Sequence, residues 1–189
     1  MLTRSWICLL SFSLPALCGN PHGPVTVLLE FDQPYSDVSV SEMEREAASV
    51  LKNTGLILDW EMEASLQPHP EFKALVVLKM KGSCEMAIAP ELIDERGPLG
   101  MAYVTDGQVL SFGEIECDRI KQSVQRVLPP STSARKERLY GRALGRVAAH
   151  EMVHMLRGST RHSKSGINQA SLTADELISN HIDLVESIK

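Results

Sequence analysis

Residues 134–158 read ARKERLYGRALGRVAAHEMVHMLRG and form the longest helical pattern in the chain. Apolar residues recur there at helical spacing, so we expect a helix from about Ala134 to Leu156. Gly158, directly after this pattern, is a typical helix stop. Small side chains crowd the same stretch, at Gly141, Ala143, Gly145, Ala148 and Ala149. They predict that the helix packs closely against a sheet.

Three apolar runs upstream have the composition of buried strands, being rich in β-branched residues. They are Val25–Phe31, Leu56–Met62 and Ala74–Met80. Between the first two runs, Ser39 and Glu42 have the spacing of a capping box, which predicts the start of a helix. Asn53 and Gly55 are expected to end that helix. The order strand, helix, strand favours a parallel pair of strands joined by a right-handed crossover.

Asp106-Gly107 lies between the apolar runs Tyr103–Thr105 and Gln108–Phe112. An Asp-Gly pair in this setting predicts a tight hairpin, because both central positions of the turn need positive φ. At least one strand is therefore expected to be antiparallel to its neighbour. The segment Gly82–Gly100 is rich in Pro, Gly and acidic residues and is expected to be irregular. A short helix is expected from Cys117 to about Leu128, where two prolines follow.

These elements predict an α+β fold with an α/β-like core. Its sheet is mixed and mostly parallel, with one antiparallel hairpin strand, and is packed by one helix and by the long helix of residues 134–156. Near the end of the chain, Thr173 and Glu176 form a second capping box pattern. The apolar residues after it predict a terminal helix reaching Val185. We expect a single domain over residues 24–189.

Residues 1–19 have the pattern of a signal peptide. Arg4 provides the positive start, the apolar stretch from Trp6 to Leu14 is too short to span a bilayer, and small residues follow Pro15. We therefore expect a secreted or periplasmic protein. Lipid anchoring at Cys18 is the less favoured alternative, because Leu17 before it is bulky.

Composition excludes several classes of function. The net charge is -5, and the 19 Lys and Arg residues are scattered, so nothing predicts binding to nucleic acid. No later stretch is apolar for long enough to predict a membrane span.

After removal of the signal peptide, Cys84 and Cys117 remain, and in an oxidising compartment two thiols predict a disulfide. Two separate buried thiols are the alternative. We expect a monomer.

The long helix ends in His150-Glu151-Met152-Val153-His154. Residues four apart lie on one face of a helix, so both imidazoles can bind a single zinc ion. Glu151 can then contact a zinc-bound water without being a ligand itself. Zinc lowers the pKa of this water, the carboxylate takes its proton, and the hydroxide attacks a carbonyl carbon. The motif thus predicts a Zn²⁺ site with Glu151 as the general base.

A catalytic zinc ion usually has three protein ligands and one open position. His162 is the favoured third ligand, because Gly158 lets the chain turn back toward the metal after the helix. Its alternative is a solvated loop histidine. Glu176 is the competing ligand, although the capping box already explains it. His181 is a weak candidate for substrate contact.

With these residues in view, the chain resembles the zincin metallopeptidases, most closely the metzincins. The metzincin pattern runs HExxH, Gly, a third His, and a tight turn containing Met beneath the metal. Gly158 and His162 follow His154 by four and eight residues, where metzincins have three and six, and Asn168 stands where the Met of Gly-Ile-Met would be. The chain is also similar to a group of exported bacterial proteins with an HExxH helix and a later His.

The resemblance implies an antiparallel edge strand that binds a peptide or protein substrate, with Tyr103–Thr105 or Val109–Phe112 lining the cleft. The leading hypothesis is a secreted zinc metallopeptidase that hydrolyses peptide bonds with a metal-activated water and Glu151 as general base. A non-catalytic exported protein that binds zinc and acts as an interaction module is the alternative. A purely structural exported domain is the third possibility.

Overall fold

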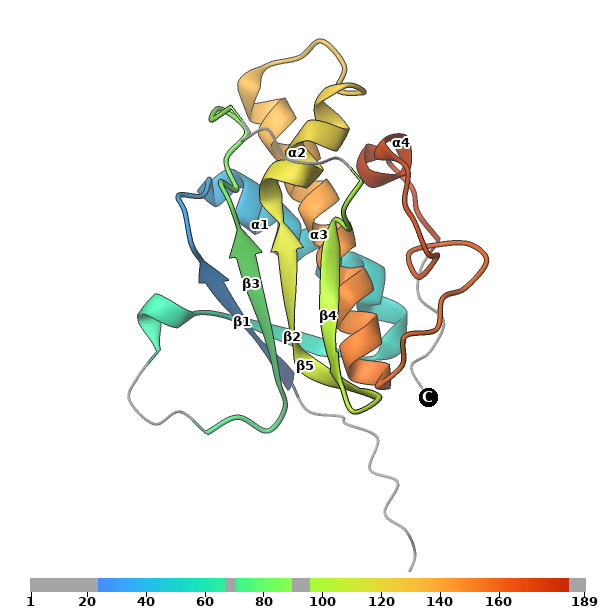
Figure 1. Ribbon diagram of the computed structural model, residues 1–189. Coiled ribbons are helices and arrows are strands. Elements are labelled where there is room, and N and C mark those ends of the chain that lie inside the picture. The colour runs from blue at the N-terminus through green and yellow to red at the C-terminus, as the bar shows by residue number, and fades with distance from the viewer. Residues whose placement is uncertain (1–23, 67–70, 90–95, 184–189) are drawn as a thin grey trace, which may run out of the picture.

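The computed structural model describes residues 24–66, 71–89 and 96–183, so the predicted signal peptide and Cys18 lie outside the described residues. Five strands form one sheet in the order β2-β1-β3-β5-β4 (Figure 1). The strands are β1 Pro24–Phe31, β2 Ile57–Met62, β3 Leu75–Lys81, β4 Gly100–Thr105 and β5 Gln108–Glu116. The helices are α1 Asp37–Leu51, α2 Cys117–Gln125, α3 Ser133–Arg157 and α4 Ala174–Ile178, with short 3₁₀ turns at Lys52–Thr54 and Glu63–Ser65.

The pairing confirms the predicted fold class. β1 is parallel to β2 and β3, and β3 is parallel to β5. β4 is antiparallel to β5, and the turn between them has φ of 49° at Asp106 and 76° at Gly107. Positive φ at both positions is the geometry for which Asp-Gly is favoured. The sheet is therefore mostly parallel, with one antiparallel strand at its edge.

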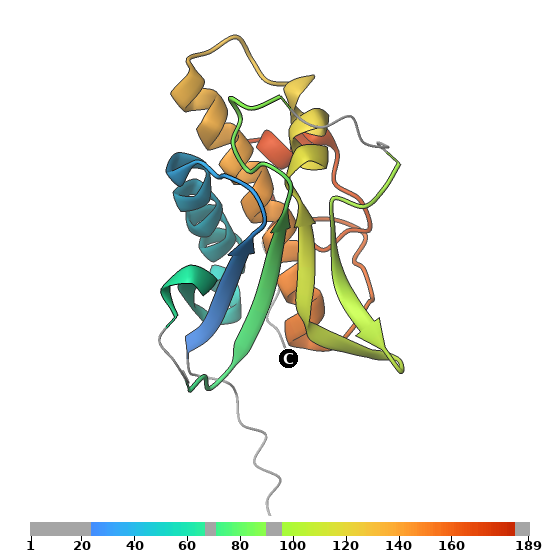
Figure 2. The same ribbon diagram turned by 60° about the vertical axis from the view of Figure 1, so that its left-hand side comes forward.

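α1 and α3 lie side by side against the same face of the sheet (Figure 2). The strands turn alternate side chains toward these helices, as in β3, where Val76, Leu78 and Met80 are buried and the residues between them are partly exposed. Met43 of α1 and Met152 of α3 are fully buried in the same core. α3 thus runs through the interior, and its C-terminal half reaches the edge formed by β4.

The two glycines of α3 face another helix and not the sheet that the sequence predicted. A side chain at Gly141 or Gly145 would collide with the backbone of α1, at the carbonyl oxygens of Ser39 and Met43 respectively. The two glycines therefore allow the two helices to approach each other, and the prediction of close packing on the sheet is wrong for them. Glycines four apart lie on one helix face, which is why a single neighbour contacts both.

The start of α1 also differs from the prediction. Ser36 is the N-cap, and its hydroxyl accepts a hydrogen bond from the backbone N–H of Ser39. Ser39 itself is fully buried inside the helix, where its hydroxyl donates to the carboxylate of Glu137 on α3. The capping box predicted at Ser39 and Glu42 is therefore wrong, because tertiary contact with α3 uses the Ser39 hydroxyl.

At the C-terminal end, the capping box of Thr173 and Glu176 is confirmed. α4 ends at Ile178, however, and the helix predicted to reach Val185 is wrong for the described residues; residues 184–189 lie outside them. The physical reason is that arginine side chains of α3 bind the carbonyl oxygens that a longer helix would use. Arg142 donates to Ile178 and Ser179, and Arg146 also donates to Ser179.

The predicted disulfide between Cys84 and Cys117 is present, and both residues are fully buried. It joins the loop after β3 to the start of α2 and closes a loop across 33 positions of the sequence. A disulfide of this kind is typical of an oxidising compartment. Among the helices of the described residues, none is long and apolar enough to cross a membrane.

Candidate metal centre

The last turns of α3 carry the HExxH residues into a cleft. Helical geometry places His150 and His154 one turn apart on the same face. The helix then ends at Gly158, whose φ of 57° lies in the left-handed region. Its backbone N–H and that of Ser159 bind the last carbonyl groups, including that of His154. This turn directs the following loop back toward the face that carries the histidines.

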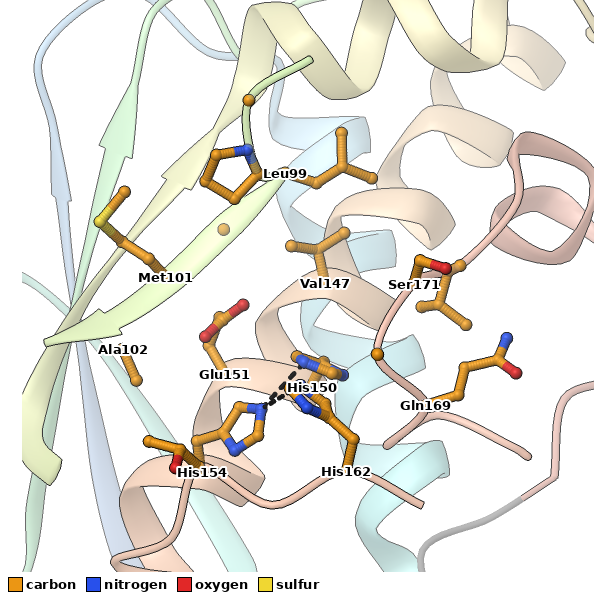
Figure 3. Close-up of a pocket in the computed structure, with 16 residues that line it drawn as sticks. Leu99, Met101, Ala102, Val147, His150, Glu151, His154, His162, Gln169 and Ser171 are labelled. Atoms are coloured by element: carbon orange, nitrogen blue, oxygen red, sulfur yellow. Dashed lines mark hydrogen bonds between the residues drawn. The ribbon is translucent and has the colours of Figure 1, made fainter. Parts of the chain in front are cut away.

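Three imidazoles converge at this point (Figure 3). The Nε2 atom of His154 lies 3.0 Å from Nε2 of His150 and 3.2 Å from Nε2 of His162. His150 and His154 come from α3, whereas His162 comes from the returning loop. The structure therefore brings together the three residues that the sequence singled out as metal ligands.

The hydrogen bonds at the opposite ring nitrogens decide where the protons are. Nδ1 of His150 lies 2.8 Å from the carbonyl oxygen of Ile167, and Nδ1 of His154 lies 2.7 Å from that of Ser159. A carbonyl oxygen only accepts, so Nδ1 must be the donor in each ring. The lone pair of each neutral ring is then on Nε2, and two lone pairs face each other at close range. Two facing lone pairs repel each other, and a cation bound between them removes this repulsion.

A proton does not fit this role well near neutral pH. Burial lowers the pKa of His150 to about 4, and burial also lowers the pKa of His154. The neutral form of each ring is therefore favoured at pH 7. Two nitrogens bound at about 2.0–2.1 Å to one tetrahedral zinc ion are about 3.3–3.4 Å apart. The two separations from Nε2 of His154 are close to this value, and the three donor atoms all lie within 4.8 Å of one another. Three imidazole nitrogens are a donor set that suits zinc.

Glu151 lies between the histidines and β4 (Figure 3) and is 5% exposed. Burial raises its pKa to about 7, although a hydrogen bond from the backbone of Ala102 acts in the opposite direction. A carboxyl group with this pKa can accept and release a proton near neutrality.

Close approach of β4 to α3 depends on a glycine. A Cβ atom at Gly100 would lie 2.8 Å from Cγ1 of Val147 and 3.0 Å from Cγ of Glu151. The absence of a side chain at Gly100 therefore allows the edge strand to pass directly beside the proposed general base. The sequence pattern did not single out this residue, because its role depends on a contact between segments about fifty positions apart.

The cleft around the histidines has a volume of about 430 Å³. The segment from Gly97 to Ala102 forms one wall, and the segment from Gln169 to Leu172 forms the other. The apolar side chains among the lining residues include Leu99, Val147 and Leu172. The first half of β4 thus lines the cleft, and the prediction that Tyr103–Thr105 or Val109–Phe112 would do so is wrong. β5 lies inside the sheet, and residues 103–105 lead away to the hairpin.

No protein-family model matches the chain, and no curated protein matches it. Among solved structures, the chain is similar to archaemetzincin from Methanopyrus kandleri, with 13% sequence identity and a TM-score of 0.47. The alignment covers 85% of this chain and 88% of that chain. At this TM-score the two backbones agree only coarsely, and the chemistry of the site follows from this chain's own residues.

The other two candidates from the sequence have different surroundings. The carboxylate of Glu176 accepts hydrogen bonds from Thr173 and Gln169, and these lower its pKa. It is not part of the group of histidines. His181 is exposed and lies 3.6 Å from Asp183, and it does not line the cleft. The carbonyl groups of Ser159 and Ile167, which orient the two helix histidines, were not predicted from the sequence.

Proposed function

We propose that the protein is a zinc-dependent metallopeptidase. The observation that carries the proposal is the convergence of three histidine Nε2 atoms beside a buried carboxyl group, in a cleft that a sheet edge borders. His150, His154 and His162 are the proposed zinc ligands, and Glu151 is the proposed general base.

Zinc bound to the three histidines would act as a Lewis acid and lower the pKa of a coordinated water toward neutrality. Glu151 accepts the proton of the attacking water and later delivers it to the leaving amine. Its burial supports this role, because a pKa of about 7 suits both transfers. The N–H of Ala102 keeps the carboxyl group at the edge of the cleft, and the carbonyl groups of Ile167 and Ser159 fix the ring orientations of His150 and His154.

A peptide is the substrate that best fits the borders of the cleft. The carbonyl oxygen of Leu99 accepts a hydrogen bond from the N–H of Glu116 in β5. Backbone groups alternate along a strand, so those of Gly100 and Ala102 point to the free edge. The N–H of Ala102 donates to Glu151, which leaves the backbone groups of Gly100 and the carbonyl oxygen of Ala102 for a substrate. An extended peptide can pair with such an edge, as in β-strand addition. The apolar side chains of Leu99, Val147 and Leu172 favour an apolar residue next to the scissile bond.

The proposal is tested with purified protein and a casein substrate. We expect about one zinc ion per chain, with hydrolysis that is lost on chelation and restored by zinc. Glu151→Gln should retain zinc and lose activity by a factor of about 10²–10⁴, because it removes the proton acceptor and keeps the shape. Cleavage by this variant at the wild-type rate would contradict the assigned role.

Ligand assignment needs a separate comparison. His162→Ala should weaken zinc binding strongly, whereas Glu176→Gln should leave zinc affinity unchanged, because the Glu176 carboxylate caps α4. Competition titration with a chromophoric chelator measures both affinities. A larger loss in Glu176→Gln than in His162→Ala would reverse the assignment of the third ligand.

A non-catalytic zinc-binding protein is the second candidate. The observation that favours it is the spacing of the proposed ligands: Gly158 and His162 follow His154 by four and eight residues, where the metzincin pattern has three and six. Stoichiometric zinc without turnover of a broad peptide library would support this function over a peptidase.

We also propose that the protein is exported by a signal peptide in residues 1–19. The buried disulfide supports an oxidising location. N-terminal sequencing of the protein from the extracellular or periplasmic fraction tests the proposal. A chain that still begins at Met1 there would contradict removal of the signal peptide.

A further inference from the structure

The three histidines differ in how firmly they are held. His150 and His154 lie on α3, and a backbone carbonyl binds Nδ1 of each ring. His162 lies on the loop after α3, and its residue is exposed. The position of its imidazole therefore depends on the contacts that hold this loop.

Asn168 contacts the loop on both sides of His162. Its side-chain amide donates to the carbonyl oxygen of Arg161 at 3.3 Å, and its backbone carbonyl accepts from the N–H of Ser163 at 2.8 Å. Asn168 is only 8% exposed, so this attachment is made from inside the protein. The two hydrogen bonds hold Arg161 and Ser163, the residues on either side of His162, to the buried Asn168.

The residue before Asn168, Ile167, contacts His150. Ile167 is 1% exposed, its carbonyl oxygen lies 2.8 Å from Nδ1 of His150, and its N–H donates to the carbonyl oxygen of Asp183. Two consecutive residues thus connect the loop histidine and a helix histidine to the same buried turn. A shift of this turn would change the distance between the two rings.

The side chain of Asn168 is not explained by packing stability. Its Oδ1 atom is buried and has no hydrogen-bond partner among the described residues. A buried polar atom without a partner is costly, and an apolar side chain would avoid that cost. The favourable polar contact of the side chain is the one to Arg161, next to His162.

We propose that Asn168 is a positioning residue that holds His162 in place to complete the metal centre, an inference that rests on the proposed zinc-binding function. Residues that orient metal ligands typically change metal affinity by about 10–100-fold when they are replaced. Asn168 acts through His162 and does not contact the metal. The zinc affinity of the site therefore depends on how firmly Ile167 and Asn168 hold the loop that carries His162.

The test is a double-mutant cycle that measures the zinc affinity of the purified full-length protein. A chromophoric chelator serves as the competitor. Asn168→Ala should weaken zinc binding by about 10–100-fold. In the His162→Ala background, the same substitution should have no further effect, because its target is already gone. Asn168→Asp, which keeps the shape and removes the donor, should behave like Asn168→Ala. Asn180→Ala is the matched control: it also removes one side-chain hydrogen bond, to Arg142, and should bind zinc as the wild type does.

Cobalt substitution gives a second readout that a general loss of stability would not move. The visible spectrum of the cobalt-loaded Asn168→Ala protein should shift toward that of His162→Ala. Wild-type zinc affinity in Asn168→Ala, or equal losses in both backgrounds, would overturn the positioning role and leave the proposed function standing. A wild-type chain that binds no zinc would overturn both.

Discussion

The substitution Gly100→Ala tests whether the edge strand must pass directly beside the general base. Ordinary contact begins near 3.4 Å, so the new methyl group requires movement of about 0.6 Å at Val147 and about 0.4 Å at Glu151. Overpacking of this kind costs about 1–3 kcal/mol of the free energy of unfolding. A misplacement of about 1 Å at an active site can lower the rate by about 10²-fold, so we expect kcat/KM to fall by about tenfold.

The assay compares kcat/KM on a peptide substrate, zinc affinity and urea unfolding in the same preparations. Zinc affinity should stay at the wild-type value, because the atoms nearest to the new methyl group belong to Val147 and Glu151 and not to a proposed ligand. Gly141→Ala is the matched control. Its methyl group would meet the Ser39 carbonyl and the Glu42 side chain of α1, neither of which lines the cleft, so it should lower stability without disturbing Glu151. Wild-type kcat/KM in Gly100→Ala, or an equal loss in Gly141→Ala, would refute the reasoning.

Three other predictions concern stability and its dependence on pH. Arg146→Ala should lower the free energy of unfolding by about 1.5–3 kcal/mol, because it removes the guanidinium 2.8 Å from the buried Glu46 and leaves Arg45 and Arg142 at 3.8 and 3.9 Å; urea unfolding measures this, and a loss below 1 kcal/mol would contradict it. Replacing Cys84 and Cys117 by Ser should cost about 3–4 kcal/mol, the value expected for a loop of this length, and unchanged thermal unfolding would argue against the bridge. In metal-free protein, the raised pKa of Glu151 means that the folded state loses stability as pH rises from the ordinary value of 4.5 to about 7. Glu151→Gln should therefore be more stable than the wild type at pH 8 and have no such advantage below pH 4.5; an equal difference at both pH values would exclude this origin.

Local patterns predicted the elements well where one segment supplies all the information. The three apolar runs became β1, β2 and β3, and Asp106-Gly107 became the turn between β4 and β5. Gly158 ends α3 in the left-handed conformation, as expected. In each case, the intrinsic φ preference or the side-chain period of a few neighbouring residues is enough to decide the structure.

Predictions were wrong where a segment distant in the sequence forms hydrogen bonds with polar groups that the local pattern had assigned to another contact. The hydroxyl of Ser39 could have capped a helix, but it contacts Glu137 from inside α1. The apolar residues after Thr173 could have continued α4, but Arg142 and Arg146 bind the carbonyl groups at its end. Side-chain partners of this kind are far away in the sequence, so no local pattern contains them.

For the candidate site, the HExxH spacing alone placed His150 and His154 on one helix face with Glu151 beside them, because helical periodicity is a property of the backbone. Which further residues join them was decided by the tertiary structure. The return of the loop brings His162 within 3.2 Å of His154, the carbonyl groups of Ile167 and Ser159 set the ring tautomers, and Gly100 admits the edge strand. These contacts depend on how the chain packs as a whole, since burial and close approach exist only once separate segments share one core.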